Sequence, residues 1–274
     1  MSKFTHHITP PSGFSLAVKE LWQYRELFYF FTWRDIKVKY KQTYLGIIWA
    51  LLQPLAMMLI FTFIFSKTLK IDSGNIVYPI FVLSALVLWN FFNSSVSNAA
   101  ESMIQHSNII KKIYFPRLII PGSSLLVAFF DFLIGLLIFF ALCIYYHQSI
   151  SWTAIFYFPA GILVVLITAF GLGTFLAALN VKFRDFRYTI PFLLQILFFA
   201  SQIIYPLQSI KQDWLYYLLS LNPMNAGIEL FRSPLSNTSP DFNVIIIGTA
   251  TSILLFIIGI FYFRKTEAFF ADIA

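Results

Sequence analysis

The most constraining feature of this chain is an uncharged apolar run, LGIIWALLQPLAMMLIFTFIFS, at residues 45–66. A helix of that length rises about 33 Å at 1.5 Å per residue, close to the thickness of a bilayer's hydrocarbon core. Because lipid offers no hydrogen-bond partner to an open backbone, such a run must satisfy its own amides and carbonyls as a helix. The run therefore predicts a transmembrane helix.

The same criterion predicts five more spans. Charged residues make up only 11% of the chain and hydrophobic residues 59%, whereas about a quarter of a soluble domain is charged. We therefore expect an all-α integral membrane protein with six transmembrane helices. The five further spans are residues 76–104, 119–146, 152–180, 188–207 and 243–263.

The distribution of cations predicts the orientation. Fifteen of the 19 Lys and Arg residues fall on one side if the N-terminus is cytoplasmic, in agreement with the positive-inside rule. Four of them, at 34, 37, 39 and 41, directly precede the first span. Six spans then place both termini in the cytoplasm. The net charge of +7 reflects this topology and predicts no nucleic-acid partner.

The chain divides into four predicted parts. Residues 1–16 read as a flexible tail, 17–43 as an interfacial helix with a basic linker, 44–263 as the transmembrane domain and 264–274 as a cytoplasmic tail. The helix at the start of the second part is amphipathic and aromatic, which favours a position in the headgroup layer. A short cytosolic helix bound to a partner protein is the alternative.

Two segments between spans have structure of their own. Residues 105–118 are long enough for one or two helical turns, so they form either a docking loop or a simple connector. Residues 208–242 are amphipathic and broken at Asn222–Pro223, where Asn suits a helix N-cap and Pro the first helical position. We predict a re-entrant pair of short helices there, with a hairpin lying flat on the membrane as the alternative.

Catalytic and metal-binding patterns are not found. No glycine precedes a lysine, which excludes the phosphate-binding loop GxxxxGK[ST]. The four histidines lack metal-ligand spacing, and the single cysteine, Cys143, cannot form an intrachain disulfide. Asp131 is the one carboxylate deep in a span, where it either has a function or pairs with a neighbouring helix. No catalytic residue, metal or cofactor is expected in this chain.

Amide and aromatic side chains recur at helical spacing along the first, second and fifth spans. Amides and hydroxyls bind sugar hydroxyls and aromatic faces stack on sugar rings, whereas an ion pore uses charged rings or carbonyl cages. The stripes therefore favour a carbohydrate pathway, with hydrogen bonding between helices as the alternative. The predicted pathway residues are Trp49, Gln53, Trp89, Asn90, Asn93, Ser97, Phe199, Gln202 and Tyr205.

Six stretches resemble, in order, the transmembrane subunits of ABC transporters that export polysaccharides such as O-antigen, capsule and teichoic acid. They are RDIKVKYKQTYLGIIWALLQPL, LSALVLWNFFNSSV, NIIKKIYFPRLIIP, LNVKFRDFRYTIPFLLQILFFASQIIYP, LNPMNAGIELFR and FRKTEAFFADIA. The resemblance covers nearly the whole chain from about residue 21.

The resemblance implies a homodimer with two separate ATP-binding cassette subunits, which bind ATP and Mg²⁺ on the cytoplasmic side. The amphipathic helix and the first cytoplasmic loop would contact those subunits, and the re-entrant pair would close the outer end of the channel. The implied coupling residues are Glu20, Arg25, Asn108, Lys111, Lys112, Tyr114 and Arg117. The implied external gate consists of Trp214, Tyr216, Tyr217, Asn222 and Pro223.

The expected function is export of a lipid-linked polysaccharide, O-antigen foremost, across the bacterial inner membrane. Two alternatives stay open. A permease for small hydrophobic molecules would show an apolar pathway, and a membrane-embedded glycan-processing enzyme would need clustered acids near the membrane surface.

Overall fold

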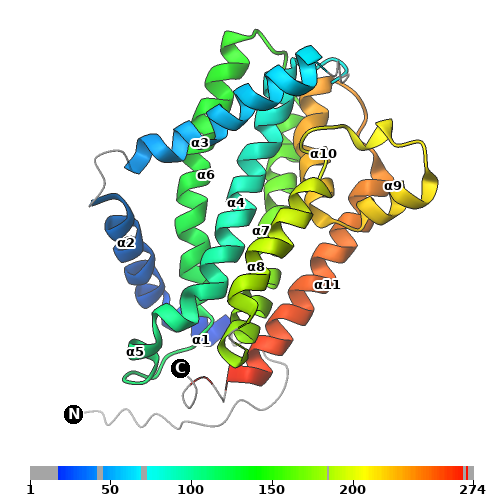
Figure 1. Ribbon diagram of the computed structural model, residues 1–274. Coiled ribbons are helices and arrows are strands. Elements are labelled where there is room, and N and C mark those ends of the chain that lie inside the picture. The colour runs from blue at the N-terminus through cyan, green and yellow to red at the C-terminus, as the bar shows by residue number, and fades with distance from the viewer. Residues whose placement is uncertain (1–17, 42–45, 69–72, 184, 268–269, 271–274) are drawn as a thin grey trace.

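The computed structural model describes residues 18–41, 46–68, 73–183, 185–267 and 270, and this part of the chain contains helices and no strand (Figure 1). The fold class is all-α, as predicted. The helices are α1 Val18–Gln23, α2 Arg25–Lys41, α3 Gly46–Phe61, the π-helix η1 Thr62–Thr68, α4 Tyr78–Gln105, α5 Ser107–Ile110, α6 Ile119–Tyr145, α7 Ala154–Lys182, α8 Phe186–Phe199, the 3-10 helix η2 Leu207–Ser209, α9 Asp213–Ser220, α10 Pro223–Ser236 and α11 Phe242–Thr266.

Four of these helices are long and apolar enough to cross a membrane, namely α4, α6, α7 and α11. They correspond to the predicted spans 76–104, 119–146, 152–180 and 243–263. The other two predicted spans contain shorter apolar helices, at Leu51–Ser66 and in α8. That these two also cross the membrane stays a prediction.

The predicted span 188–207 is wrong in length, because α8 ends at Phe199 and residues 200–206 are not helical. At 14 residues α8 rises only about 21 Å, less than the hydrocarbon thickness of about 30 Å. Irregular backbone is stable inside a membrane protein only where other parts of the protein satisfy it. Here α10 supplies those partners, as described below.

The core is built around α4, which is buried along most of its length against α6 and α7. Small residues bring the other long helices close together. An alanine Cβ at Gly161 on α7 would lie 2.7 Å from the Gly227 carbonyl oxygen on α10, and one at Gly259 on α11 would meet the backbone of Gly171 on α7. Such close approach is how membrane helices gain packing energy without a hydrophobic driving force.

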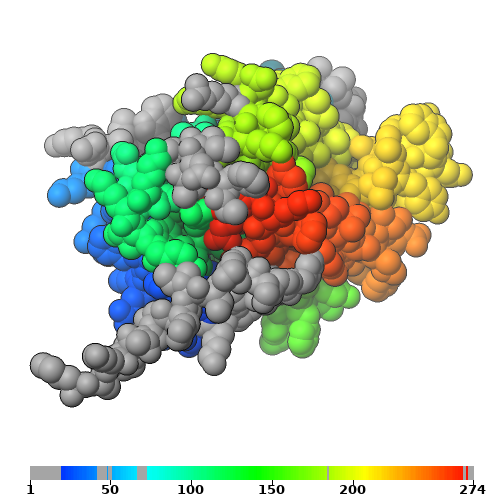
Figure 2. Space-filling model, turned by 90° about the horizontal axis from the view of Figure 1, so that it is seen from below, coloured from blue at the N-terminus to red at the C-terminus, as the bar shows by residue number. Residues whose placement is uncertain are grey.

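A second, smaller core lies where α1, α5 and the end of α11 gather (Figure 1). Its buried residues come mostly from six helices, and they include Phe31 of α2, Met103 of α4 and Phe263 of α11. Seen from this end, the α5 region in green lies beside the end of α11 in red (Figure 2). The α9–α10 segment (residues 200–241) lies away from this end (Figure 1).

Candidate functional site

A pocket of about 440 Å³ lies between α3, α4 and α6. Asn90, Asn93 and Ser94 follow one another at three- and four-residue steps and so share one face of α4, while Gln53 comes from α3. The structure thus brings three predicted pathway residues, Gln53, Asn90 and Asn93, into one cavity, which we call the polar pocket. Its polar lining is Lys39, Gln53, Asn90, Asn93, Ser94 and Asp131.

The amides of this pocket are not used in packing. The side-chain amides of Gln53, Asn90 and Asn93 make no hydrogen bond to any residue in the described part of the chain, and each residue is at least partly exposed. Amides that hold helices together would bond across the interface. At these three positions the pocket therefore has hydrogen-bonding groups available to a bound molecule.

Asp131 pairs with a neighbouring helix, one of the two alternatives for it. Its carboxylate accepts hydrogen bonds from the Lys39 ammonium and the Tyr40 hydroxyl, which tie α6 to the end of α2. Burial and the bonded Asp131 carboxylate raise the pKa of Tyr40, so the phenol keeps its proton and its role as a donor. Lys39 and Asp131 both line the polar pocket.

The other predicted pathway residues lie outside this pocket. Trp89 is buried, with its ring centroid 5.3 Å from that of Phe198 on α8. Ser97 is half-buried on α4, and Phe199 is exposed at the end of α8. The hydroxyl of half-buried Tyr205 donates to the Phe199 carbonyl at 3.0 Å. Trp49 belongs to α3, and its side chain lies outside the described residues.

Gln202 was predicted to line the carbohydrate pathway, but in the structure it is buried. Its side chain is 1% exposed, and its amide nitrogen donates to the Asn225 carbonyl at 2.8 Å and to Glu229 at 3.2 Å. The alternative of packing between helices therefore holds here, and Gln202 faces no open space within this protomer. Periodicity places Gln202 on a helical face but does not say what covers that face.

Arg232 of α10 is a buried structural residue that the sequence reading missed. Its guanidinium donates to the carbonyls of Gln202 at 2.6 Å, Phe81 at 2.7 Å and Ile203 at 3.0 Å. It also lies 3.5 Å from the centroid of the Phe81 ring. The bonds to Gln202 and Ile203 satisfy backbone carbonyls that the end of α8 leaves without helical partners, and the bond to Phe81 ties α10 to α4. An isolated cation in an apolar segment was the only signal in the sequence.

The α9–α10 segment confirms the predicted helix break. The Asn222 side-chain oxygen accepts the Met224 amide at 3.1 Å, and Pro223 is the first residue of α10. Tyr216 donates its hydroxyl to Asp241 at 2.6 Å, while Trp214 and Tyr217 are exposed. How deeply this segment enters the membrane stays a prediction.

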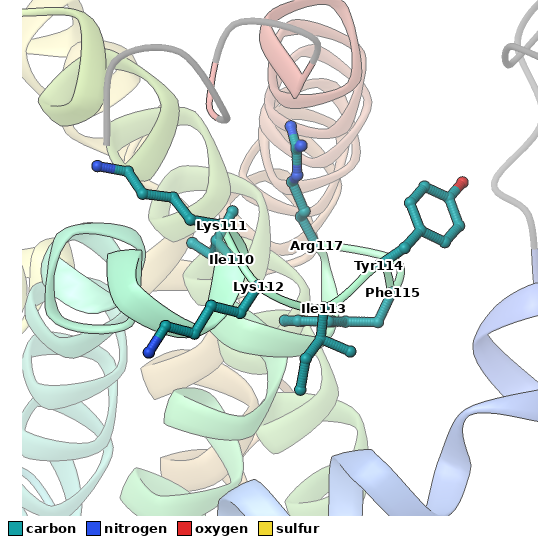
Figure 3. A pocket seen from close by; sticks show the side chains of 7 residues that line it. All are labelled: Ile110, Lys111, Lys112, Ile113, Tyr114, Phe115 and Arg117. Carbon is teal, nitrogen blue, oxygen red and sulfur yellow. The ribbon is translucent and has the colours of Figure 1, made fainter.

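The α5 loop (residues 107–118) is fixed by the buried side chains of Ile110, Phe115 and Leu118. It encloses a hollow of about 200 Å³. Figure 3 shows the exposed Lys111 and Lys112 extending to one side of the loop and the exposed Tyr114 to the other. Asn108 of α5 is also exposed. The loop thus presents two cations and an aromatic ring to its surroundings.

The amphipathic region forms two helices, α1 and α2. The predicted coupling residues Glu20 and Arg25 are half-buried and exposed, respectively, and Arg25 lies 5.6 Å from the ring of Trp22. The aromatic side chains of Trp22 and Tyr29 are exposed. They are open to contact with lipid headgroups or with a partner protein. The interfacial position and the partner-bound position of this region both stay predictions.

α2 is joined to the end of α4 through His106. The His106 Nδ1–H donates to the Ser102 carbonyl at 2.8 Å, which leaves Nε2 to accept from Arg34. Arg34 also binds Asp35 at 2.7 Å. The part of the chain that the structure describes holds no cluster of three His, Cys, Asp or Glu side chains suited to a metal ion.

Several known proteins are similar to this chain over most of its length. The chain is similar to the O-antigen export system permease protein RfbA of Myxococcus xanthus, with 29% identity over 93% of this chain and 98% of that protein. It is 28% identical to an RfbA of the same description from Klebsiella pneumoniae, over 88% of this chain and 92% of that protein. It is also 28% identical to the polysialic acid transport protein KpsM of Escherichia coli, over 73% and 77%.

A family match covers residues 26–236, from the start of α2 to the end of α10. These residues contain the polar pocket, the α5 loop and most of the α9–α10 segment, and the match confirms the family that the sequence stretches indicated. The chain is a multi-pass membrane protein that belongs to the ABC-2 type transporter family.

Proposed function

We propose that the chain is the permease subunit of an ATP-driven exporter of a lipid-linked polysaccharide, with O-antigen as the first candidate. Two copies would form the channel across the bacterial inner membrane. The printed functions of the relatives support the substrate class, since RfbA is named for O-antigen export and KpsM for polysialic acid transport.

The observation that carries this proposal is that three side-chain amides in the polar pocket have no hydrogen-bond partner among the described residues. A sugar chain offers hydroxyl groups that both donate and accept hydrogen bonds, and an amide side chain can do both in return. Gln53, Asn90 and Asn93 surround one cavity with such groups. The aromatic Phe199 and Tyr205 lie on the neighbouring α8 and the segment after it, where they are suited to stack on sugar rings.

Energy would come from two ATP-binding cassette subunits that bind ATP and Mg²⁺. The sequence lacks a phosphate-binding loop, so a partner must supply the site. The α5 loop, with α1 and α2 beside it, offers the exposed cations and aromatic residues for that contact. Both termini would be cytoplasmic, on the side where the sequence places 15 of its 19 cations.

The polar pocket argues against the two alternatives. A permease for small hydrophobic molecules would present an apolar cavity, whereas six polar residues line this one. An enzyme that processes glycans by acid–base chemistry would need a pair of carboxylates near the substrate. In the described residues around this pocket Asp131 is the only carboxylate, and it is bonded to Lys39 and Tyr40.

The test is a double substitution, Gln53→Leu with Asn93→Leu, in the complete exporter. Loss of about two hydrogen bonds to the sugar, near 1 kcal/mol each, predicts a fall in export of roughly thirtyfold. Assembly with the ATPase should not change. Export is measured as polysaccharide reaching the outer side of the inner membrane, and assembly by co-purification.

Asn98→Leu is the matched control, because Asn98 is an exposed amide on α4 outside the pocket. It should leave export near the wild-type level. Full export by the double variant, or a loss of assembly with export per complex unchanged, would contradict the proposed role of the pocket.

A further inference from the structure

Glu267, directly after α11, is bonded to the α5 loop. Its carboxylate accepts the Arg117 backbone amide at 3.2 Å, and the Arg117 guanidinium donates to the Glu267 carbonyl oxygen. The other carboxylate oxygen accepts from Arg264 of α11 at 3.0 Å. One carboxylate therefore joins the loop before α6 to the last turn of α11.

We call the bonds among Glu267, Arg117 and Arg264 the Glu267 clamp. This clamp is largely shielded from solvent. The side chains of Arg264 and Glu267 are only 18% and 16% exposed, so water and salt weaken their attraction less than they weaken a surface ion pair. Phe270 is fully buried beneath it, with its ring 5.9 Å from the Arg117 guanidinium and 5.1 Å from the Phe263 ring. Charge-assisted bonds over a packed aromatic base hold the loop in a fixed orientation.

The loop side of the clamp is also electrostatically linked to α1. Burial raises the pKa of the Tyr114 phenol, and the negative charges of Glu20 and Glu267 raise it further. Tyr114 therefore lies within the field of both carboxylates. The α5 loop, α1 and the end of α11 also share the second core, to which they contribute Ile110, the half-buried Leu21 and Phe263, respectively.

The opposite end of α11 is bonded to the α9–α10 segment. Asp241, the N-cap of α11, accepts the Tyr216 hydroxyl of α9 at 2.6 Å, and its backbone amide donates to Glu229 of α10 at 3.1 Å. An alanine Cβ at Gly248 would lie 2.6 Å from the Ala226 Cβ of α10. α11 therefore makes specific contacts at both ends.

α11 is continuous between these two attachments. Its 25 residues rise about 38 Å without an internal proline. A packed helix moves as a rigid element, since a well-packed interior does not deform continuously. A displacement of the α5 loop would reach the α9–α10 segment through α11 with little loss.

We propose that Glu267 is the positioning residue through which the α5 loop drives α11, and that α11 in turn moves the α9–α10 segment. This inference rests on the proposed function, in which the ATPase subunits dock on the α5 loop. The Glu267 carboxylate attaches α11 to the α5 loop on the cytoplasmic side, and the movement of α11 opens the outer end of the channel.

The experiment uses the full permease–ATPase complex with Tyr217→Cys as a reporter in α9. The native Cys143 is buried, so a membrane-impermeant maleimide reports on the introduced thiol. Labelling rates are compared with and without ATP, in Glu267, Glu267→Ala and Glu267→Gln backgrounds. ATP hydrolysis and complex assembly are measured on the same preparations.

With Glu267 present, ATP should change the labelling rate severalfold. Glu267→Ala should abolish that change while the complex still assembles and hydrolyses ATP. Glu267→Gln should keep most of it, because an amide oxygen still accepts the Arg117 backbone N–H. Lys265→Ala, an exposed residue of the same helical turn, is the control and should behave as wild type.

An unchanged ATP response in Glu267→Ala would overturn the inference. Equal losses of ATP response in the Ala and Gln variants, or loss of assembly in Glu267→Ala, would also overturn it, because they indicate a local structural role. A missing ATP response when Glu267 is present would instead overturn the proposed function itself.

Discussion

Polar side chains of the same type have opposite environments in this protein. Gln202 and Asn225 are buried and bonded to backbone and to each other, whereas Gln53 and Asn93 line a cavity with no partner among the described residues. Arg232 belongs with the first group. It replaces the helical hydrogen bonds that end with α8 and so makes a non-helical stretch stable next to membrane helices.

The residue-scale prediction concerns this arginine. Arg232→Leu leaves the carbonyl oxygens of Gln202 and Ile203 without a donor, at about 1–3 kcal/mol each, so we expect a loss of stability on the order of 3 kcal/mol. Arg232→Lys should recover only part of it, because one ammonium does not reproduce the geometry of the guanidinium fork. The measurement is thermal unfolding of the purified protein in detergent.

Lys211→Leu is the control for this prediction, since Lys211 is an exposed cation in the same segment. Its effect should stay within about 0.5 kcal/mol, as for most surface substitutions. Equal unfolding temperatures for Arg232→Leu and Lys211→Leu would contradict the structural role of Arg232.

At the scale of elements, α7 and α11 are held together by backbone contact. The two helices share an extensive interface, and Gly171 faces Gly259 with no room for a Cβ. The Thr168 hydroxyl adds a hydrogen bond to Ser252 at 2.9 Å across the same interface. Small residues and a hydroxyl pair are the usual means of joining helices within lipid.

We therefore expect Gly259→Ala to destabilise the protein by about 1–3 kcal/mol, because the helices must separate to admit the methyl group. The measurement is again thermal unfolding in detergent. Ile257→Ala, on the exposed side of the same helix, should have a smaller effect. A more stable Gly259→Ala variant would show that α11 can shift without cost.

At the scale of the whole molecule, the chain has two specialised ends joined by long helices. The α5 loop and the end of α11 lie at one end, the α9–α10 segment lies away from it, and α4 forms the buried centre (Figure 1). The polar pocket lies beside α4, where residues of α2, α3 and α6 also line it. This layout separates the surface proposed for the partner from the residues proposed for the sugar.

The prediction at this scale is that Lys111→Glu with Lys112→Glu uncouples the ATPase subunits. Reversing two exposed cations should weaken co-purification at least tenfold and reduce export in parallel, while membrane insertion stays normal. The permease alone should show no ATP hydrolysis. Lys182→Glu is the control, an exposed cation at the end of α7 outside the α5 loop. Unchanged export by the double variant would count against docking at this loop.

The sequence by itself determined the fold class, four long spans and the helix break at Asn222–Pro223. Uncharged runs of bilayer length permit only helices in lipid, and caps are local signals that need no distant partner. The family followed from six stretches read in order, and residues 26–236 confirm it.

Only the tertiary structure decided which polar side chains form hydrogen bonds within the protein and which remain available to a bound molecule. Helical periodicity places Gln53 and Gln202 on similar faces, but the helix that covers each face is set by contacts between residues far apart in sequence. For the same reason the end of α8 at Phe199, the burial of Arg232 and the Glu267–Arg117 clamp were not visible in the sequence. A hydrogen bond across 150 residues leaves no local pattern.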